Sequence, residues 1–372
     1  MRILIAPDKF KGSLGACEVA NAIAAGIRDI LQNAEITCMP VADGGEGTAE
    51  VICAAAGGEW HECEVHDPLG ALVTARYCTI EHGATAVMEM SEASGLWRVP
   101  ESERDPLLGS SFGTGEMLRD AARRGVREII LGLGGSATND GGVGCARALG
   151  FHFLDVENAQ LGPAVPELLR LAQIVRPDDL RLPRIIAAVD VRNPLLGKRG
   201  ATRTFGPQKG ATHEQVELLE RALQRLADVV ARDFGTDHRE IPGAGAAGGL
   251  GYALASFCSA ELRPGFEVVS ERIGLLEAIE AADIVITGEG RLDAQTAEGK
   301  APAGVAKLVE PRGKKVFAIV GAKENDQSST ALFDGVLSLV DEGITAEAAM
   351  QECAELLQVR ARHLAQQFSA GG

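Results

Sequence analysis

The chain has 372 residues, of which 46% are hydrophobic and 24% charged, so it can form two or three domains that each bury a core. This composition excludes a wholly disordered chain. The formal net charge of −16, from 36 basic and 52 acidic residues, argues against nucleic acid as a partner, because that affinity comes mainly from neutralised phosphates.

The first sixty residues alternate between strand and helix patterns. Residues 2–6 form an aliphatic run that predicts a strand, and apolar residues recur at helical spacing over 19–31. Residues 35–41 predict a second strand, which a glycine-rich loop joins to a helix at 48–56. Two strand–loop–helix units in succession indicate a parallel sheet.

The middle of the chain has a different pattern. Residues 60–90 alternate apolar and polar side chains and carry turn sequences at 67–70 and 81–83, which predicts β-hairpins. Further elements are expected in the order helix 115–124, strand 128–133, helix 143–149, strand 184–189 and helix 214–234. The uncharged stretch 241–260 holds five glycines and a proline, which favours a buried loop leading into a helix over a membrane span.

The last hundred residues return to the opening pattern. Strands are expected at 282–287, 316–320 and 335–339, and helices at 301–309 and 346–364. The fold class is therefore α/β with two domains. A parallel-sheet, Rossmann-like domain is built from both chain ends, 1–62 plus 266–372, and a mixed α/β domain is inserted at 63–265.

The cysteines and the N-terminus indicate the cellular location. The eight cysteines contain no Cys-x-x-Cys pair, so reduced thiols packed as small apolar residues are expected. The N-terminal segment becomes polar at Asp8, directly after Pro7, which is unlike a signal peptide. We therefore expect a cytoplasmic protein with no membrane partner.

Five loops combine glycine with polar side chains at the carboxyl ends of expected strands. They lie at 6–13, 42–48, 134–142, 190–194 and 288–296. Ligands of open α/β sheets bind outside the carboxyl ends of the strands, and helix N-termini there favour anions. Carboxylates beside such glycines suit a divalent cation held together with phosphate oxygens. The loops therefore predict a Mg²⁺–nucleotide site and phosphoryl transfer.

The common nucleotide-binding motifs do not explain this site. The chain has no Gly-x-x-x-x-Gly-Lys-Ser/Thr loop and no protein-kinase signature. Residues 243–248 match Gly-x-Gly-x-x-Gly, but 236–242 does not read as the buried strand that a dinucleotide fold requires.

Six blocks of sequence resemble the bacterial glycerate kinases of the type-1 family, in family order and over essentially the whole chain. They are APDKFKGSL at 6–14, PVADGGEGT at 40–48, GGSATNDGG at 134–142, FGPQKGAT at 205–212, PGAGAAGG at 242–249 and TGEGRLDAQT at 287–296. Within the first block, Lys9 departs from the family pattern, which leaves Lys11 as the motif lysine.

The resemblance implies an enzyme that uses ATP to phosphorylate D-glycerate, an alcohol-group phosphotransferase, most simply at the 2-hydroxyl to give 2-phosphoglycerate; the expectation of Mg²⁺ comes from the loops above. It also implies an active site in the cleft between the two domains. Attack by the 3-hydroxyl, a kinase for another small hydroxy acid such as tartronate or a sugar acid, and a non-catalytic nucleotide-binding regulator stay open as alternatives. The sequence also leaves homo-oligomerisation open.

Chemistry assigns expected roles to the residues of these blocks. We expect Asp190, Lys11 and Asp293 to be catalytic, with Asp190 as the general base. Asp43 and Glu46 are the expected metal carboxylates. The expected substrate- and phosphate-binding residues are Asp8, Ser13, Ser136, Thr138, Asn139, Asn193, Lys209, Arg291, Gln295 and Thr296. The glycines expected to approach the ligands are Gly44, Gly45, Gly47, Gly134, Gly135, Gly288 and Gly290.

Overall fold

The computed structural model describes residues 1–293, 300–324, 327–341 and 343–370, and the chain divides into two compact units. Unit 1 comprises Met1–Asp43, Glu50–Ala55 and Phe266–Gly372, and unit 2 comprises Gly44–Ala49 and Ala56–Gly265.

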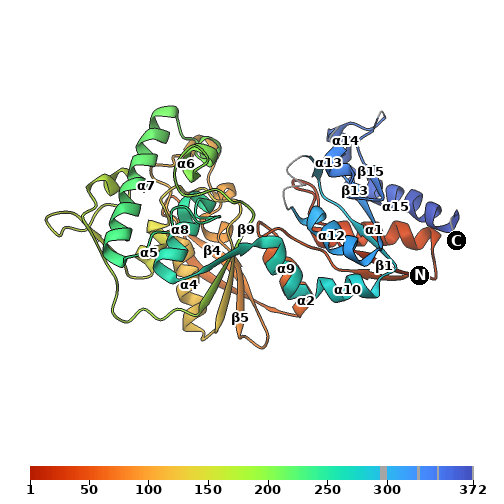
Figure 1. The fold of residues 1–372 in the computed structure, drawn as a ribbon, viewed down its shortest axis with the longest axis horizontal. Coiled ribbons are helices and arrows are strands. Elements are labelled where there is room, and N and C mark those ends of the chain that lie inside the picture. Colours follow the sequence, from red (N-terminus) through yellow and green to blue (C-terminus); the bar gives the residue numbers. More distant parts are fainter. Residues whose placement is uncertain (294–299, 325–326, 342, 371–372) are drawn as a thin grey trace. The chain divides into compact units, whose positions relative to one another are not determined.

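Unit 1 is built on a five-stranded parallel sheet with the order β15-β13-β11-β1-β2 (Figure 1). Its strands are β1 Arg2–Ile5, β2 Glu35–Cys38, β11 Ile284–Thr287, β13 Lys315–Val320 and β15 Gly335–Ser338. β1 lies between β2 and β11, with Ile3 opposite both Ile36 and Ile284. The parallel sheet that the sequence predicts from both chain ends is confirmed.

Helices α1 (Ala16–Ile30) and α15 (Cys353–Ala370), from opposite ends of the chain, pack against each other in unit 1 (Figure 1). Gly26 permits this close approach, because a Cβ there would lie 2.3 Å from the carbonyl oxygen of Gln358. Ile3 and Ile5 of the sheet join the core that these two helices form.

The other elements of unit 1 include the helix expected at 301–309 and several short elements that the sequence analysis did not predict. They are α9 Gly265–Ile273, α10 Leu275–Ala281, β12 Arg291–Leu292, α12 Ala301–Val309, β14 Ala322–Lys323, α13 Gln327–Thr330 and α14 Ala346–Gln351, with α2 Thr48–Ala56 divided between the units. The single helix expected at 346–364 is wrong. Glu352, with φ −105° and ψ 25°, separates α14 from α15.

Unit 2 is built on a six-stranded mixed sheet with the order β10-β9-β6-β5-β4-β3. The strands are β3 Glu59–His66, β4 Leu72–Ile80, β5 Thr85–Glu89, β6 Glu128–Gly132, β9 Arg184–Val189 and β10 Glu261–Pro264. β3, β4 and β5 pair antiparallel, as the hairpin patterns predict, and β5, β6, β9 and β10 run parallel. Glu89, Gly132 and Val189 therefore end three neighbouring strands at the same edge.

The long helix of unit 2 begins and ends where its sequence dictates. The N–H of Gln215 donates to Thr212 Oγ1 at 3.3 Å, the N–H of Thr212 donates to Gln215 Oε1 at 2.8 Å, and Gly235 ends α7 (His213–Phe234) in the left-handed conformation. The remaining elements are α3 Ser91–Ser94, α4 Phe112–Arg123, α5 Val143–Ala148, β7 His152–Leu154, β8 Gln173–Val175, α6 Ala201–Phe205 and α8 Ala246–Cys258; short 3₁₀ turns lie at Leu96–Arg98, Glu101–Glu103, Val165–Arg170, Pro207–Lys209 and, in unit 1, Glu310–Arg312.

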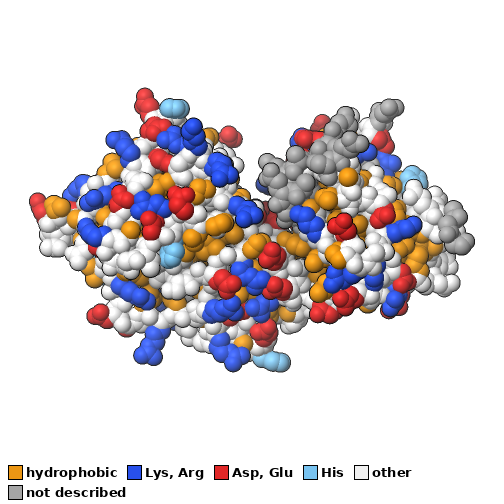
Figure 2. All heavy atoms as spheres, in the orientation of Figure 1, with side chains coloured by type: hydrophobic (Ala, Val, Ile, Leu, Met, Phe, Trp, Pro, Cys, Tyr) orange, Lys and Arg blue, Asp and Glu red, His pale blue; other side chains and the backbone are white. Residues whose placement is uncertain are grey.

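The surface, the helices and the cysteines carry three further facts. Acidic and basic side chains are interspersed on the face that Figure 2 shows. Within the described ranges, no helix combines the length and the apolar character that crossing a membrane would take. All eight cysteines are free thiols.

Candidate active site

Two of the glycine loops meet in unit 2, at the carboxyl end of β6. A Cβ on Gly134 would lie 2.5 Å from Gly45 Cα, and one on Gly132 would lie 2.6 Å from the carbonyl oxygen of Gly44. A Cβ on Gly44 would also lie 3.2 Å from the carbonyl oxygen of Ala188 in β9. Only glycine lets these backbones pass so closely, so these positions bring the 44–49 and 134–142 loops together.

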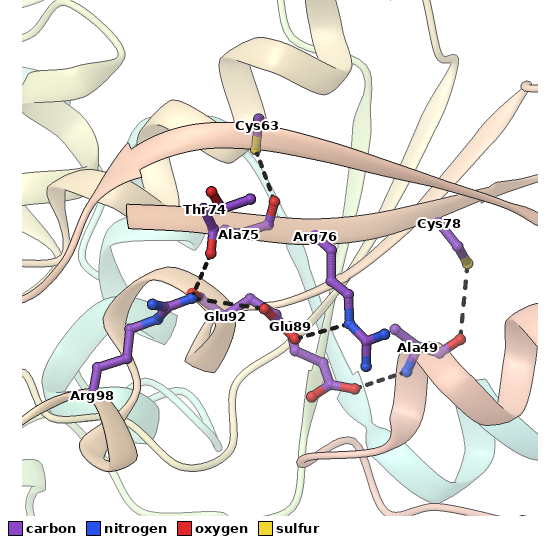
Figure 3. Close-up of polar contacts among 9 residues, drawn as sticks. All are labelled: Ala49, Cys63, Thr74, Ala75, Arg76, Cys78, Glu89, Glu92 and Arg98. Atoms are coloured by element: carbon purple, nitrogen blue, oxygen red, sulfur yellow. Dashed lines mark hydrogen bonds and ion pairs between the residues drawn. The ribbon is translucent and has the colours of Figure 1, made fainter. Parts of the chain in front are cut away.

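Glu89, at the end of β5, holds the Ala49 end of the 44–49 segment (Figure 3). Its buried side chain accepts a hydrogen bond at 2.9 Å from the N–H of Ala49, in the first turn of α2, and Cys78 Sγ lies 3.8 Å from the carbonyl oxygen of the same residue. A carboxylate at a helix N-terminus is favourable. Sequence analysis missed Glu89, and its signal is an acidic side chain within the apolar run 85–90.

The neighbouring polar cluster in Figure 3 is structural. Glu92 contacts Arg76 at 3.4 Å and Arg98 at 3.9 Å, and Arg98 also donates to the carbonyl oxygen of Thr74 at 2.8 Å. These contacts join α3 and the turn Leu96–Arg98 to β4.

The 134–142 loop turns most of its polar side chains inward. Thr138 Oγ1 donates to the carbonyl oxygen of Ala247 at 3.4 Å, and Asn139 Nδ2 donates to Thr202 Oγ1 at 2.9 Å. Gly135 is exposed and Ser136 is 7% exposed, whereas Thr138 and Asn139 are fully buried. Of the expected ligand-binding residues in this loop, Gly135 is exposed, Gly134 is half-buried, and Ser136 is buried directly beside them.

Lys209 lies behind this rim, 2% exposed, with its amine 2.6 Å from Ser136 Oγ. Burial lowers the pKa of its amine to about 7, partly offset by Asp140. The lysine thus supports the loop from within unit 2.

Asp140 organises the base of the loop, a role that sequence analysis did not assign. Its carboxylate accepts hydrogen bonds from the N–H groups of Ser111, Gly142 and Gly144 at 2.9–3.0 Å, and from Ser111 Oγ at 2.8 Å. Four donors on one buried carboxylate hold the starts of α4 and α5 together.

Asp190 lies at the same edge of the sheet, directly after β9. Its neighbour in the sheet is β6, where Gly132 is in register with Ala188, so the 134–142 and 190–194 loops leave adjacent strands. Asp190 is exposed. Asn193 is engaged locally, since its Nδ2 donates to the carbonyl oxygen of Arg199 at 2.7 Å.

In unit 1 the carboxyl ends of β1 and β11 bring three carboxylates close to one another. The N–H of Asp8 donates to the carbonyl oxygen of Gly288 at 2.8 Å, and Glu289 follows directly. Asp8 and Glu289 are buried and Asp43 is half-buried. Burial, then Asp43 and more weakly Glu289, raise the pKa of Asp8 well above its ordinary range, against an opposing effect of Lys9.

Further expected site residues of unit 1 lie in the same two loops as Asp8 and Glu289. A Cβ on Gly290 would lie 3.3 Å from the backbone nitrogen of Lys11, which is exposed, so the 6–13 and 288–293 loops are neighbours. Arg291 is paired with Glu324, and Asp293 lies 3.8 Å from Lys300.

The remaining expected residues of unit 1 are Ser13, Gln295 and Thr296. Ser13 Oγ donates to the carbonyl oxygen of Met350 at 2.8 Å, which gives it a local structural partner. Gln295 and Thr296 lie outside the described residues.

The sequence matches a family model, described as the glycerate kinase family, over residues 3–369. The chain belongs to the glycerate kinase family. It is 46% identical to a glycerate kinase of Haemophilus influenzae over 88% of this chain and 87% of that one, and 42% identical to a glycerate kinase of Bacillus subtilis over 98% and 97%.

Two further comparisons concern a relative of known name and a solved structure. The chain is 45% identical to the glycerate 2-kinase of Escherichia coli over 88% of this chain and 86% of the relative. A solved structure from Salmonella typhimurium LT2, provisionally described as glycerate kinase 2, is 44% identical, has a TM-score of 0.88, and is matched over 100% of this chain and 99% of that one.

The two metal carboxylates expected from the sequence belong to different units. Asp43 groups with unit 1, and Glu46, which is exposed, groups with unit 2. Over 1–293, 300–324, 327–341 and 343–370, no three His, Cys, Asp or Glu side chains are arranged to hold a metal ion.

Proposed function

We propose that this member of the glycerate kinase family transfers the γ-phosphoryl group of ATP to the 2-hydroxyl of D-glycerate, giving 2-phosphoglycerate and ADP. The observation that carries the proposal is the 45% identity to a glycerate 2-kinase over 88% of the chain. The convergence of the glycine loops at the carboxyl ends of parallel strands supports it, because phosphates bind at such edges.

Residues that are exposed, or that adjoin an exposed residue, receive the roles in this reaction. Asp190, exposed beside the 134–142 loop, accepts the proton of the attacking hydroxyl. Gly135 and Ser136 bind an anionic group with a backbone N–H and a hydroxyl. Lys11, exposed after β1, neutralises charge on the transferred phosphoryl group.

The carboxylates of unit 1 fit Mg²⁺ in the form in which kinases use it. Burial is the largest cause of the raised pKa of Asp8, and the nearby carboxylates of Asp43 and Glu289 add to it, so a cation beside them relieves repulsion. Mg²⁺ usually takes one or two carboxylates plus substrate phosphates, which needs no cage of three protein ligands. Bound there with ATP, it offsets the charge of the phosphates.

Two measurements test the metal. We expect Mg²⁺ binding to release protons from the wild-type protein, and less from Asp8→Asn, because the cation favours the ionised carboxylate. We also expect glycerate-dependent ADP release to stop in excess EDTA and return with Mg²⁺. Full turnover in EDTA would contradict the metal requirement.

We also propose that residues 1–62 plus 266–372 and residues 63–265 act as two domains on one pair of substrates, in a cleft that closes. Neither set alone has both the proposed metal carboxylates and the proposed base. Closure excludes water from the transferable phosphoryl group. Small-angle scattering should give a smaller radius of gyration with D-glycerate and a non-hydrolysable ATP analogue. An unchanged radius with rapid glycerate-independent ATP hydrolysis would contradict closure.

A substrate panel tests the reaction itself. ADP release is measured with ATP, Mg²⁺ and D-glycerate, L-glycerate, tartronate or a sugar acid. We expect the highest kcat/KM with D-glycerate. Preference for another hydroxy acid would identify that acid as the substrate instead. Nucleotide binding without turnover of any acid would favour a non-catalytic nucleotide-binding regulator.

A further inference from the structure

The amine of Lys209 is buried at the end of the short turn Pro207–Lys209, where it serves the 134–142 loop. Its Nζ donates to Ser136 Oγ and to the carbonyl oxygen of Thr138, both at 2.6 Å. Within the described chain, no carboxylate lies within 4.0 Å of this amine. A buried ammonium without a paired charge is costly, so this arrangement needs a reason.

The surroundings of Lys209 provide little compensating charge. Asp140 is the one ionisable group with a resolved effect on the amine, and its two oxygens already accept four hydrogen bonds from Ser111, Gly142 and Gly144. Burial is the larger influence and lowers the pKa of the amine to about 7. The two acceptors satisfy a neutral amine, whereas the third proton of an ammonium has no acceptor among the described residues.

The hydrogen bond from Lys209 determines where the hydroxyl proton of Ser136 can point. The hydroxyl oxygen accepts from Lys209, so its own proton must point away from the lysine. Ser136 is 7% exposed and adjoins the exposed Gly135, at the rim where the loop leaves β6. The hydroxyl proton has no acceptor among the described residues and can be donated to a ligand at this rim.

We propose that Lys209 is a positioning residue that acts through Ser136, holding its oxygen so that the hydroxyl donates to an anionic group of a substrate at the 134–136 rim. The anion is a carboxylate or a phosphoryl group, which share this donor chemistry. The inference rests on the proposed function. A bound anion also favours the ammonium form, so Lys209 takes up a proton from solvent on binding at pH 8.

A double-mutant cycle tests the pathway through Ser136. Lys209→Met, Ser136→Ala and the double variant are compared with wild type and with Lys198→Met, which changes an exposed lysine of the same unit. Binding of D-glycerate and of ADP is measured by calorimetry, KM and kcat by ADP release, and folding by urea unfolding. We expect each single variant to weaken the binding of one of the two ligands about 10- to 100-fold.

The double variant separates positioning from simple loop support. We expect Lys209→Met to raise the dissociation constant by less than about twofold when Ser136 is already Ala, because both changes remove the same donor. If only the dissociation constant of D-glycerate rises, Ser136 contacts the carboxylate. If only that of ADP rises, Ser136 contacts a phosphoryl group. Multiplicative losses, or a lower urea midpoint with unchanged dissociation constants, overturn the proposal.

Proton uptake supplies a readout that loop support does not move. Calorimetry at pH 8 in buffers of different ionisation enthalpy should show greater proton uptake by wild type than by Lys209→Met. Equal uptake overturns the coupling. If Lys209→Met does not fold, unchanged binding and KM in Ser136→Ala still overturn the proposal.

Controls separate this inference from the proposed function. Wild-type protein that releases no ADP with D-glycerate refutes the proposed function. Wild-type turnover together with independent effects of Ser136→Ala and Lys209→Met refutes the role of Lys209 alone.

Discussion

The contact between Gly134 and Gly45 makes a steric prediction about unit 2. In Gly134→Ala the new Cβ would lie 2.5 Å from Gly45 Cα, whereas carbon atoms in contact are about 3.5–4.0 Å apart. Both atoms belong to backbone or to its first side-chain carbon, so no rotamer change relieves the overlap. The two loops must separate by roughly 1 Å.

This displacement has a cost in stability and a larger one in catalysis. Overpacking of this kind costs about 1–3 kcal/mol, so we expect a lower urea midpoint. Displacing a substrate-positioning group by about 1 Å can reduce rate on the order of 10²-fold. We therefore expect kcat/KM for D-glycerate to fall about 10²-fold while the variant stays folded at 25 °C.

The matched control is Gly162→Ala, also in unit 2. Its new Cβ would lie 3.5 Å from Glu167 Cγ, an ordinary contact, and we expect a wild-type kcat/KM. Urea unfolding followed by fluorescence and ADP release measured under the same buffer conditions give both quantities. A Gly134→Ala variant with wild-type midpoint and kinetics would refute the argument that these loops are fixed by backbone contact.

Three further predictions follow from single residues. Asp190→Asn should lower kcat by about 10²–10⁴-fold with an unchanged urea midpoint, because it removes the proposed base at an exposed position; near wild-type kcat would move the base elsewhere. Lys11→Met should lower kcat more than it raises either KM, and Lys9→Met should do little; a larger loss at Lys9 would assign the motif lysine to position 9. The pKa of Lys209 is about 7 in the folded protein and 10.5 ordinarily, so between these pH values the folded state binds fewer protons than the unfolded state. The free energy of unfolding of wild type should therefore rise with pH relative to that of Lys209→Met, by up to about 1.4 kcal/mol per pH unit. Parallel pH profiles of the two proteins in urea unfolding would contradict this.

Local patterns predicted much of the fold because periodicity and caps act within one element. The helix expected at 48–56 is α2, Thr48–Ala56, and the strand expected at 128–133 is β6, Glu128–Gly132. The expected helix at 346–364 failed at Glu352, where the backbone leaves helical geometry although helix-forming residues flank it. β10, Glu261–Pro264, was missed because two of its four residues are charged and one is proline, so it shows no aliphatic run.

The candidate site was predicted in its composition but less in its geometry. The glycine loops were expected to approach ligands, yet Gly44 and Gly134 approach other backbone. Sequence cannot distinguish the two cases, because both need the space of a missing Cβ. The burial of Lys209 likewise depends on the fold around it, and a lysine in a polar loop gives no local sign of burial.

Phosphorus NMR of the product tests the central claim most directly. Wild-type protein is incubated with ATP, Mg²⁺ and D-glycerate, and the product resonance is compared with authentic 2-phosphoglycerate and 3-phosphoglycerate. The account predicts 2-phosphoglycerate formed in step with ADP. A product resonance from 3-phosphoglycerate, or ATP loss with no phosphoglycerate at all, would contradict it.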